Sequence, residues 1–537
     1  MNLFQPEKEP GIPSLNKGIE LKSPISWGVA TGVLFATSYP PFPAWALFFS
    51  FVPLWVYWFK AKSAKQVLIS GFTAQFTFNL IGFNWVAHTA TEYGHIPAIL
   101  SILILFGFCC IASLNVVIVG YLAWAIQSRW KFKPWWFFLS VAVFSGAGDW
   151  LYPTIFPWNS GYPLLFSKFH SAQLAEFTGF NLLGTLVYMA NGAFALSLLS
   201  FPKKGWSRPL VLFTMALFLC EVIGTHIENR LPPEDKTMSA LLVQPNIGNY
   251  DKYVAERGNG YQEPVVRKDF AITEQGLQTA TKRPDIIIWP ETAYPENLDP
   301  WFANRFYAQE LQKFVDDHGV PLITGSYSED DINTPVRRDY NAVFALQPHT
   351  PFLPGYRKQV LLAFGEYFPG AKYFPFLKNI IPEISDFGRG RGPIAFNVNG
   401  VRFLPLICYE GLDTLYVQKA NWLGGHVFVN VTNDSWFGKN FEPIQHMIMT
   451  VARTVEYRRP LVRVTNTGYT IVADFKGHIL KEGPMGTEWT TMADIPYLSA
   501  PTLTFFSHIA PFVSMIFLMM AVTVFLLGRF CGDKPRT

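Results

Sequence analysis

The sequence predicts a multi-span α-helical membrane bundle of about eight helices that carries one large α/β domain. Three observations support this fold class. Half of the 537 residues are hydrophobic and only 15% are charged, whereas soluble chains carry about 25% charged residues. Apolar stretches of the length that membrane helices need fill roughly residues 24–225 and return near 503–528. Between them, short β-rich segments alternate with amphipathic helical segments, as in an α/β domain.

The charge balance and the cysteines exclude several classes of protein. The 43 basic and 39 acidic residues nearly cancel, which argues against a nucleic-acid-binding protein. Four of the five cysteines lie in apolar stretches or in the C-terminal tail, and Cys408 alone lies in the large polar region. A single cysteine there cannot form an internal disulfide, so Cys408 is either a buried filler or a working thiol.

The first apolar group divides into seven predicted membrane helices, and an eighth lies near the C-terminus. They cover about 25–38, 44–59, 67–87, 97–126, 134–149, 173–200, 208–225 and 503–528. The first two are short and separated only by Tyr39–Pro43, so they predict a tight helical hairpin. The first 20 residues have no apolar core, and no small-residue cleavage pattern follows the first helix, so we expect no cleaved signal peptide.

Basic residues predict the orientation. They precede the first predicted helix and follow the second, fourth, sixth and eighth, whereas loops such as 88–95 have almost none. The positive-inside rule then places both termini in the cytoplasm and the polar region on the opposite side. We therefore expect a membrane bundle at 1–225, an extracytoplasmic domain at 226–502, and a last membrane helix with a cytoplasmic tail at 503–537.

The polar region contains the segments expected of an α/β domain. The predicted strands are 239–247, 285–293, 320–328, 339–347, 401–410, 426–432 and 461–473. The predicted helices are 262–282, 301–318, 412–423 and 442–458. Neither internal repeats nor low-complexity segments occur, so this pattern indicates sheets covered by helices.

Reactive side chains follow the ends of apolar segments at two places. Glu291 comes after a strand that stops at a proline, and Lys358 and Glu366 bracket a mostly apolar segment. Taken singly, a carboxylate or lysine at such a position is more often an exposed loop or surface residue. Neither Glu291 nor the segment from Lys358 to Glu366 establishes a functional site by itself.

Cys408 ends the apolar strand 403–407, where a helix is expected to begin. A thiol at a helix N-terminus lies near the positive end of the dipole and near free N–H groups. This placement predicts a lowered thiol pKa and donors for an oxyanion. The alternative is a buried structural cysteine.

Glu291, Lys358 and Cys408, in this chain order on an α/β domain, resemble the catalytic set of the nitrilase superfamily. Seven predicted spans before the domain and one after it narrow the resemblance to the apolipoprotein N-acyltransferase family of bacterial envelopes. The segments that carry it are Trp289–Ala293, Tyr356–Pro369, Ile407–Gly411, Asn433–Gly438, Arg459-Pro460 and Thr465–Gly468. The resemblance implies an αββα sandwich with Cys408 as nucleophile, Glu291 as general base and Lys358 stabilising the oxyanion.

The same resemblance implies roles for the neighbouring residues. Glu366 and Glu410 would be supporting carboxylates, and Tyr409 would supply a backbone N–H to the oxyanion and a ring beside the site. Tyr253 and Trp436 would contact substrate. Tyr253 is a departure, because the family usually has a tryptophan there, and Ala363 replaces a usual proline.

The resemblance also implies the reaction and its partners. The donor would be a membrane phospholipid, the intermediate a cysteine thioester, and the acceptor the α-amino group of a diacylglyceryl-modified apolipoprotein. The expected location is the bacterial inner membrane, with the domain in the periplasm. No cofactor, metal or nucleic acid is expected. The alternatives are a membrane-tethered nitrilase-type amidase and a non-catalytic scaffold.

Three weaker signals leave their interpretation open. The loop 368–387, rich in Phe, Ile, Leu and Pro, is either a hydrophobic cover that excludes water and dips toward lipid or a loop packed on its own domain. Asn433-Asp434 is either polar lining of the site or a satisfied turn. His446 is more often a packed or surface histidine than a functional one.

Overall fold

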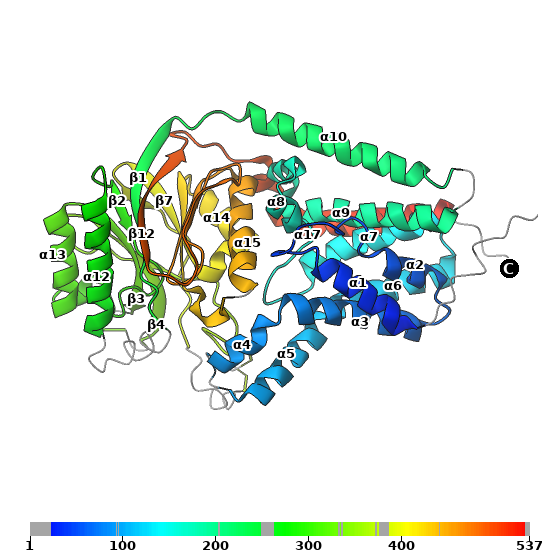
Figure 1. The fold of residues 1–537 in the computed structure, drawn as a ribbon, viewed down its shortest axis with the longest axis horizontal. Coiled ribbons are helices and arrows are strands. Elements are labelled where there is room, and N and C mark those ends of the chain that lie inside the picture. Colours follow the sequence, from blue (N-terminus) through cyan, green and yellow to red (C-terminus); the bar gives the residue numbers. More distant parts are fainter. Residues whose placement is uncertain are drawn as a thin grey trace, which may run out of the picture.

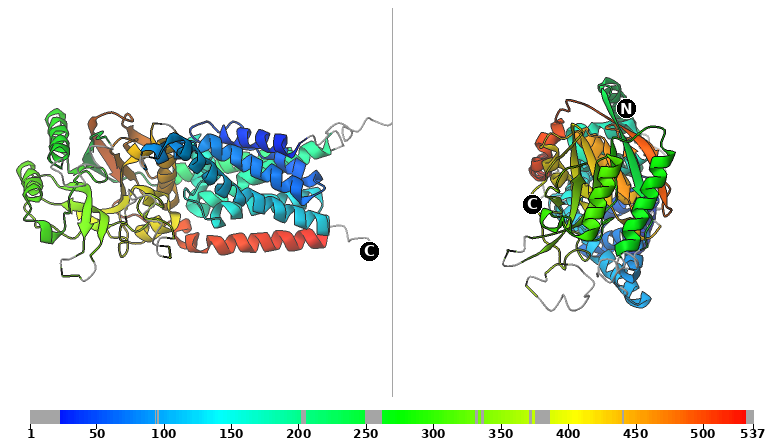
Figure 2. Two further views of the ribbon diagram at one scale, coloured as in Figure 1. Left: turned by 90° about the horizontal axis from the view of Figure 1, so that it is seen from below. Right: turned by 90° about the vertical axis from the view of Figure 1, so that its left-hand side faces the viewer.

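The computed structural model describes residues 23–92, 94, 96–201, 205–248, 262–330, 333–334, 337–370, 373–374, 386–439 and 441–531. Helices from the beginning and the end of the chain form an elongated bundle. Two β-sheets with flanking helices lie at one end of that bundle (Figures 1 and 2). The prediction of a helical membrane bundle that carries an αββα sandwich is therefore confirmed.

The bundle is built from helices that mostly run along its long axis (Figure 2). They are α1 (Pro24–Ala36), α2 (Val52–Lys60), α3 (Ala64–Gly82), α4 (Trp85–Glu92), α5 (Ala98–Ala112), α6 (Leu114–Trp130), α7 (Pro134–Leu151), α8 (Tyr162–Phe166), α9 (Ala175–Ser200), α10 (Arg208–Arg230), α16 (Phe505–Ile509) and α17 (Val513–Cys531). Proline stands in the first turn of α1, α7 and α10, where the missing N–H would have had no partner within the helix.

Four helical segments among the described residues are long and apolar enough to cross a membrane. They are Ala98–Trp130, His170–Ser200, Arg208–Arg230 and Phe505–Phe530. Helix α10 shows their character most clearly, because Gly224 is its one buried residue and large side chains such as Leu212 and Phe218 point outward. Such a surface is unfavourable in water and suits a hydrocarbon environment.

The bundle differs from the prediction at several places. The expected span 67–87 ends as α3 at Gly82, and a separate helix, α4, runs from Trp85 into the expected loop 88–95. The expected span 97–126 consists of α5 and α6, which are interrupted at Ser113, where the hydroxyl donates to the carbonyl of Cys109. The second arm of the expected hairpin starts as a helix only at Val52. The preceding chain is held in turns because the side chain of Ser38 accepts the N–H of Ala46.

Each sheet has six strands. The first has the order β12 (Trp489–Tyr497), β1 (Lys236–Gln244), β2 (Ile286–Ile288), β3 (Leu322–Glu329), β4 (Asp339–Leu346), β5 (Tyr356–Arg357). The second has the order β11 (Ile479–Glu482), β10 (Ile471–Ala473), β9 (Leu461–Thr465), β8 (Val427–Thr432), β7 (Val401–Ile407), β6 (Phe396–Val398). Strands β1–β2–β3 and β7–β8–β9 are parallel, and all other pairs are antiparallel.

Helices cover the outer face of each sheet (Figure 1). Helices α12 (Gln262–Thr279) and α13 (Phe306–His318) lie on the first sheet, and α14 (Thr414–Asn421) and α15 (Glu442–Tyr457) lie on the second. Side chains alternate along the strands, so Leu241 of β1 packs with the core under α12 and Leu242 packs between the sheets. Helix α15 is buried along nearly its whole length because it lies between the second sheet and the bundle.

Several strands differ in extent from the prediction. Strand β2 ends at Ile288, although the N–H of Trp289 and the carbonyl of Pro290 still bond to β3, and the chain turns at Glu291. The expected strand 461–473 is a hairpin made of β9 and β10. The expected strand 401–410 ends at Ile407, and a short 3₁₀ helix, Cys408–Leu412, follows it. Strands β5, β6, β11 and β12 were not predicted.

Candidate active site

The three predicted catalytic side chains lie at strand ends. Glu291 follows β2, Lys358 follows β5 and Cys408 follows β7. All three side chains are buried. Because β2 and β5 belong to the first sheet and β7 belongs to the second, the site lies where the two sheets meet.

The Glu291 carboxylate is held on both of its oxygens. Its Oε1 accepts a hydrogen bond from Asn341 Nδ2 at 2.7 Å, and its Oε2 accepts one from the backbone N–H of Asn433 at 2.8 Å. Lys358 Nζ lies 3.6 Å from Oε1. Donors from β4 and from the segment after β8 thus fix the orientation of this carboxylate, which distinguishes it from an exposed loop residue.

A second carboxylate, Glu366, lies on the other side of the lysine. Lys358 Nζ donates to Glu366 Oε1 at 2.8 Å, and the N–H of Leu362 donates to Oε2 at 2.8 Å. Asn341 Nδ2 also donates to Glu366 Oε1, at 3.0 Å, so one amide bridges both carboxylates. Asn341 was missed from the sequence; the available signal was an amide within a strand that is otherwise buried and apolar.

These carboxylates determine the charge of Lys358. Burial by itself would lower the pKa of the ammonium, but Glu366 and Glu291 together raise the pKa above its ordinary value. The lysine therefore stays cationic in a site from which bulk water is excluded. A fixed positive charge of this kind suits a reaction in which negative charge develops on a carbonyl oxygen.

The Cys408 thiol differs from the expectation. Burial raises its pKa well above the usual range, Glu291 adds to this effect, and the opposing effect of Lys358 is too small to reverse it. The predicted lowering was wrong because the helix that follows is a single five-residue 3₁₀ turn, too short for a strong dipole, and because the thiol is buried. The raised pKa favours a neutral thiol, so Cys408 could act as a nucleophile only if a base took its proton.

Glu410 connects the lysine-bearing segment to the cysteine-bearing turn. Its carboxylate accepts the backbone N–H of Ile407 at 2.8 Å, that of Gln359 at 2.6 Å and that of Val360 at 3.1 Å. The hydroxyl of Tyr356 donates to it at 2.7 Å. Burial raises the pKa of Glu410 to about 7. Its position suits a supporting carboxylate that sets the distance between two parts of the site.

Tyr409 points away from the sheets. Its hydroxyl donates to the backbone carbonyl of Ile155, and its ring packs edge-on against Phe156, with ring centroids 5.9 Å apart. Phe156 in turn packs against Trp85 at 4.7 Å and Phe437 at 6.2 Å. The residue next to Cys408 is thus part of an aromatic contact between the sandwich domain and the bundle.

A cavity of about 550 Å³ lies between α4 and the catalytic domain. Its lining includes His88 and Glu92 from α4, and Ser435 and Lys439 from the segment after β8. Trp436, in the same segment, is half-buried. Its predicted substrate contact stays a prediction. The other predicted contact, Tyr253, lies outside the described residues.

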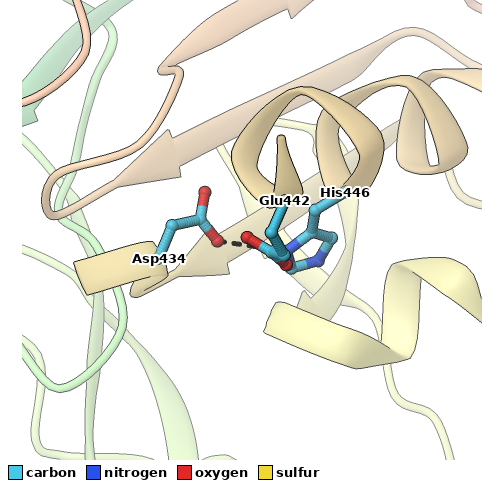
Figure 3. A group of neighbouring side chains, drawn as sticks. All are labelled: Asp434, Glu442 and His446. Carbon is cyan, nitrogen blue, oxygen red and sulfur yellow. Dashed lines mark hydrogen bonds and ion pairs between the residues drawn. The ribbon is translucent and has the colours of Figure 1, made fainter. Parts of the chain in front are cut away.

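One group of described side chains could hold a metal ion by its donor set: Asp434, Glu442 and His446 (Figure 3). His446 Nδ1 lies 3.0 Å from Asp434 Oδ1 and 3.3 Å from Glu442 Oε1. Arg463 Nη2 donates to the other Asp434 oxygen at 2.7 Å. Burial and Arg463 oppose protonation of His446, but Asp434 and Glu442 raise its pKa. Asp434 is already paired with Arg463 and His446, so its burial is explained without a metal ion.

The arrangement around Cys408 can carry out acyl transfer. A thiol, a carboxylate base and a fixed ammonium are the groups needed to form a thioester through a tetrahedral intermediate. The carboxylates and the lysine are held by hydrogen bonds in advance of substrate binding. Little reorganisation is therefore required when the reaction begins.

Comparisons with known proteins show which proteins the chain is similar to. The model of the apolipoprotein N-acyltransferase N-terminal domain matches residues 31–193, and the carbon-nitrogen hydrolase model matches 236–500. A Bdellovibrio bacteriovorus protein called apolipoprotein N-acyltransferase is 39% identical, over 89% of this chain and 89% of its own length. One with the same name from Geobacter metallireducens is 29% identical, over 86% and 87%. Among solved structures, Saccharomyces cerevisiae Nit3 of the nitrilase superfamily is 14% identical with a TM-score of 0.36, covering 49% of this chain and 91% of its own.

Proposed function

Because the chain belongs to the apolipoprotein N-acyltransferase family, we propose that it transfers an acyl chain from a membrane phospholipid to the α-amino group of a diacylglyceryl-cysteine at the N-terminus of apolipoproteins. N-acylation of apolipoproteins is the function that this membership supports. The observation that carries the mechanism is the convergence of Glu291, Lys358 and Cys408 in one buried site.

The first half-reaction forms a thioester. Glu291 takes the proton of the Cys408 thiol as the sulfur attacks the ester carbonyl carbon of the phospholipid. The net charge of the site is unchanged in this step. The carboxylate becomes neutral as it takes the proton, and the negative charge moves to the oxygen of the tetrahedral intermediate. Lys358 offsets the negative charge on the tetrahedral oxygen. Collapse breaks the ester C–O bond, Glu291 gives its proton to the leaving oxygen, and the lysophospholipid departs as an alcohol.

The second half-reaction forms the amide. The α-amino nitrogen of the acceptor attacks the thioester carbonyl, Glu291 removes a proton from this nitrogen, and the Cys408 sulfur leaves and is reprotonated. Because the acyl group waits on the enzyme, the two lipid substrates need not bind together. The result is ping-pong kinetics.

The position of the site favours lipid substrates. The aromatic contact from Tyr409 through Phe156 to Trp85 brings the nucleophile turn against the bundle. The ester that joins an acyl chain to the lipid headgroup region therefore lies close to the site of a domain that packs on the membrane bundle. An amidase that acted on soluble substrates would need no such contact.

The proposed location is the bacterial inner membrane, with the catalytic domain in the periplasm and both termini in the cytoplasm. Basic residues such as Lys60, Arg129 and Arg208 lie at ends of α2, α6 and α10. The C-terminal end of α9, the N-terminal end of α10 and the C-terminal end of α17 lie at the end of the bundle away from the sheets (Figures 1 and 2). The positive-inside rule assigns that end to the cytoplasm.

The intermediate can be tested without an acceptor. The full chain in detergent is incubated with phosphatidylethanolamine and then weighed intact. We expect an added mass of one acyl chain that hydroxylamine removes. Cys408→Ala should show no added mass, and Glu291→Gln should form it much more slowly. An adduct that persists in Cys408→Ala would reject the nucleophile assignment.

The acceptor separates the transferase from the amidase alternative. A diacylglyceryl lipopeptide with a free α-amino group is added to the preformed acyl-enzyme. A transferase yields an N-acylated lipopeptide, and the same peptide with a blocked amine leaves the adduct in place. Release of free fatty acid at the same rate with both peptides would instead support the amidase.

A further inference from the structure

A buried asparagine lies behind the Cys408 turn. Asn430, on β8, donates its Nδ2 to the carbonyl oxygen of Leu406 at 3.3 Å and to that of Cys408 at 3.2 Å. These two carbonyls flank the point where the chain leaves β7. Cys408 has a φ of 49° there, a left-handed conformation that persists only where the surroundings hold it. Asn430 is one of the groups that hold it.

The orientation of the Asn430 amide is fixed by its other partners. Its Oδ1 accepts hydrogen bonds from Arg463 Nη1 at 2.7 Å and from Thr432 Oγ1 at 2.8 Å. A guanidinium can only donate. If the amide were flipped, its NH₂ group would face the guanidinium and its oxygen would face two carbonyls. The network therefore directs Nδ2 to the nucleophile turn.

The same network reaches the base. Arg463 Nη2 is bonded to Asp434 Oδ2 at 2.7 Å. Asp434 follows Asn433, whose backbone N–H holds Glu291 Oε2 at 2.8 Å. One short stretch of chain at the end of β8 thus contacts the backbone of the nucleophile and the carboxylate of the base.

We infer that Asn430 is a positioning residue for acyl transfer: oriented by Arg463, it fixes the backbone of Cys408 so that the thiol faces Glu291. It acts through the cysteine, since its amide bonds the backbone carbonyls of the turn. The reaction it serves is the proposed function, whereas the relation between the thiol and the base can be measured without any lipid.

Two substitutions remove the donor in different ways. Asn430→Asp keeps the size of the side chain and gains an ion pair with Arg463, but it cannot donate to the carbonyls. Asn430→Ala removes the donor without adding charge. The matched control is Asn191→Asp. Asn191 is buried in the bundle and donates its Nδ2 to two backbone carbonyls, those of Leu47 and Val187.

The decisive measurement is a double-mutant cycle on thiol reactivity. Iodoacetamide is applied to the full chain in detergent at pH 7, and alkylation of Cys408 is followed by mass. The sulfur displaces iodide while Glu291 accepts the thiol proton. We expect Glu291→Gln to slow alkylation at least about tenfold in the unmodified background. In each Asn430 background the same change should cost less than about threefold, because the thiol no longer faces the base.

The outcomes separate the inference from the proposed function. An equal effect of Glu291→Gln in all backgrounds would overturn the positioning role. The Asn430 and Glu291 substitutions could be coupled in the alkylation rate while phosphatidylethanolamine gives no acyl adduct. That result would support the positioning role and count against the proposed function. In adduct formation, both Asn430 variants should lower the maximal rate about tenfold or more and leave the half-saturating lipid concentration unchanged. Asn191→Asp should change neither; if it lowers the rate as much, generic loss of a buried amide explains the effect.

If one Asn430 variant fails to fold, the other variant alone still tests the coupling to Glu291. Thr432→Val adds a third, milder variant, because it removes one of the two donors that orient the amide. Its maximal rate should fall between those of the unmodified chain and Asn430→Asp. The inference is contradicted if Thr432→Val forms the adduct at the unmodified maximal rate and Glu291→Gln slows alkylation as much in every folded Asn430 variant as in the unmodified chain.

Discussion

Lys358 lies between two carboxylates, with Nζ 2.8 Å from Glu366 and 3.6 Å from Glu291. Its charge should matter most when negative charge gathers on the tetrahedral oxygen. We expect Lys358→Met to lower the turnover of adduct formation about a hundredfold, the usual cost of a lost oxyanion contact. Lys358→Arg should lower it less, because it keeps the charge but displaces it.

Both kinetic constants for a short-chain phospholipid in detergent would check this prediction. The half-saturating lipid concentration should change little in either variant, since the bound ester has no oxyanion. Weaker lipid binding with intact turnover would instead make Lys358 a headgroup contact. The catalytic role of the segment after β5 would then have to be abandoned.

Glu410 predicts a dependence of stability on pH. Burial raises its pKa from 4.5 to about 7, so the folded state keeps a proton that the unfolded state loses. Where the folded state binds more protons, stability falls as pH rises. The contribution of Glu410 is thus largest below pH 4.5 and is lost as pH rises to about 7, a difference of about 3 kcal/mol.

The measurement for Glu410 is the melting temperature in detergent at several values between pH 5 and pH 8. We expect it to fall with pH in the unmodified chain and to fall less in Glu410→Gln, whose amide does not titrate. Parallel curves for the two proteins would show that Glu410 does not titrate in this range. Glu482→Gln, on the exposed strand β11, is a suitable control.

The sequence pointed to the acidic, basic and thiol side chains of the candidate site. It did not point to the asparagines whose contribution depends on which groups they hydrogen-bond. Glu291, Lys358 and Cys408 follow strand ends in an order that resembles a known set. Asn341 and Asn430 are ordinary asparagines within strands, and their partners are residues distant in sequence. The direction of the Cys408 pKa shift also depends on burial, which is a tertiary property.

Helix α15 is the element that joins the catalytic domain to the bundle. Gln445 donates its Nε2 to the carbonyls of Pro40 and Gly82, both at 3.0 Å, and accepts from Trp85 Nε1 at 3.3 Å. Near its other end, Arg458 Nε pairs with Glu176. A helix that carries His446 at one end and these contacts along its length transmits the position of the bundle to the site.

Removal of the Gln445 amide should therefore destabilise the junction. Gln445→Leu leaves two carbonyls and one indole N–H without a partner, at about 1–3 kcal/mol for each unsatisfied group. We expect a melting temperature lower by several degrees and reduced adduct formation. Gln309→Leu, on the exposed face of α13, should change neither. Equal melting temperatures for both variants would mean that the hydrogen bonds of Gln445 do not help to dock α15.

The length of apolar segments predicted the long membrane helices well. The ends of the strands were predicted poorly. Long apolar segments correspond to α9, α10 and α17 because lipid-facing helices must be apolar throughout. Strand β2 is only three residues long, and the chain turns at Glu291 shortly after it. Edge strands such as β5 and β6 are too short to give a periodic signal.

The main hydrophobic core of the described residues runs from the bundle into the sandwich, and a separate core lies under α12 and α13. The main core contains Phe35 of α1, Val451 of α15 and Val429 of β8. The sandwich domain is therefore packed directly on the bundle, and the turn that carries Cys408 and Tyr409 contacts the bundle through Phe156. This continuity could not be predicted, because the sequence shows α15 only as one amphipathic helix among several.

The orientation of the whole molecule is the remaining prediction. Glu92, at the end of α4, lines a cavity together with Ser435 and Lys439 of the catalytic domain, so that end of the bundle must share its compartment. Lys133 precedes α7 within the basic connection from α6, and both side chains are exposed. The positive-inside rule places Lys133 in the cytoplasm.

Single cysteines at these two positions test the orientation directly. In cells whose outer membrane has been opened, an impermeant maleimide should label Glu92→Cys and leave Lys133→Cys unlabelled. Both should react after detergent solubilisation, and the unmodified chain gives the background from its own cysteines. Labelling of Lys133→Cys alone would put the catalytic domain in the cytoplasm. That outcome would separate the enzyme from acceptors on the outer leaflet and would refute the proposed location while leaving the chemistry of Cys408 intact.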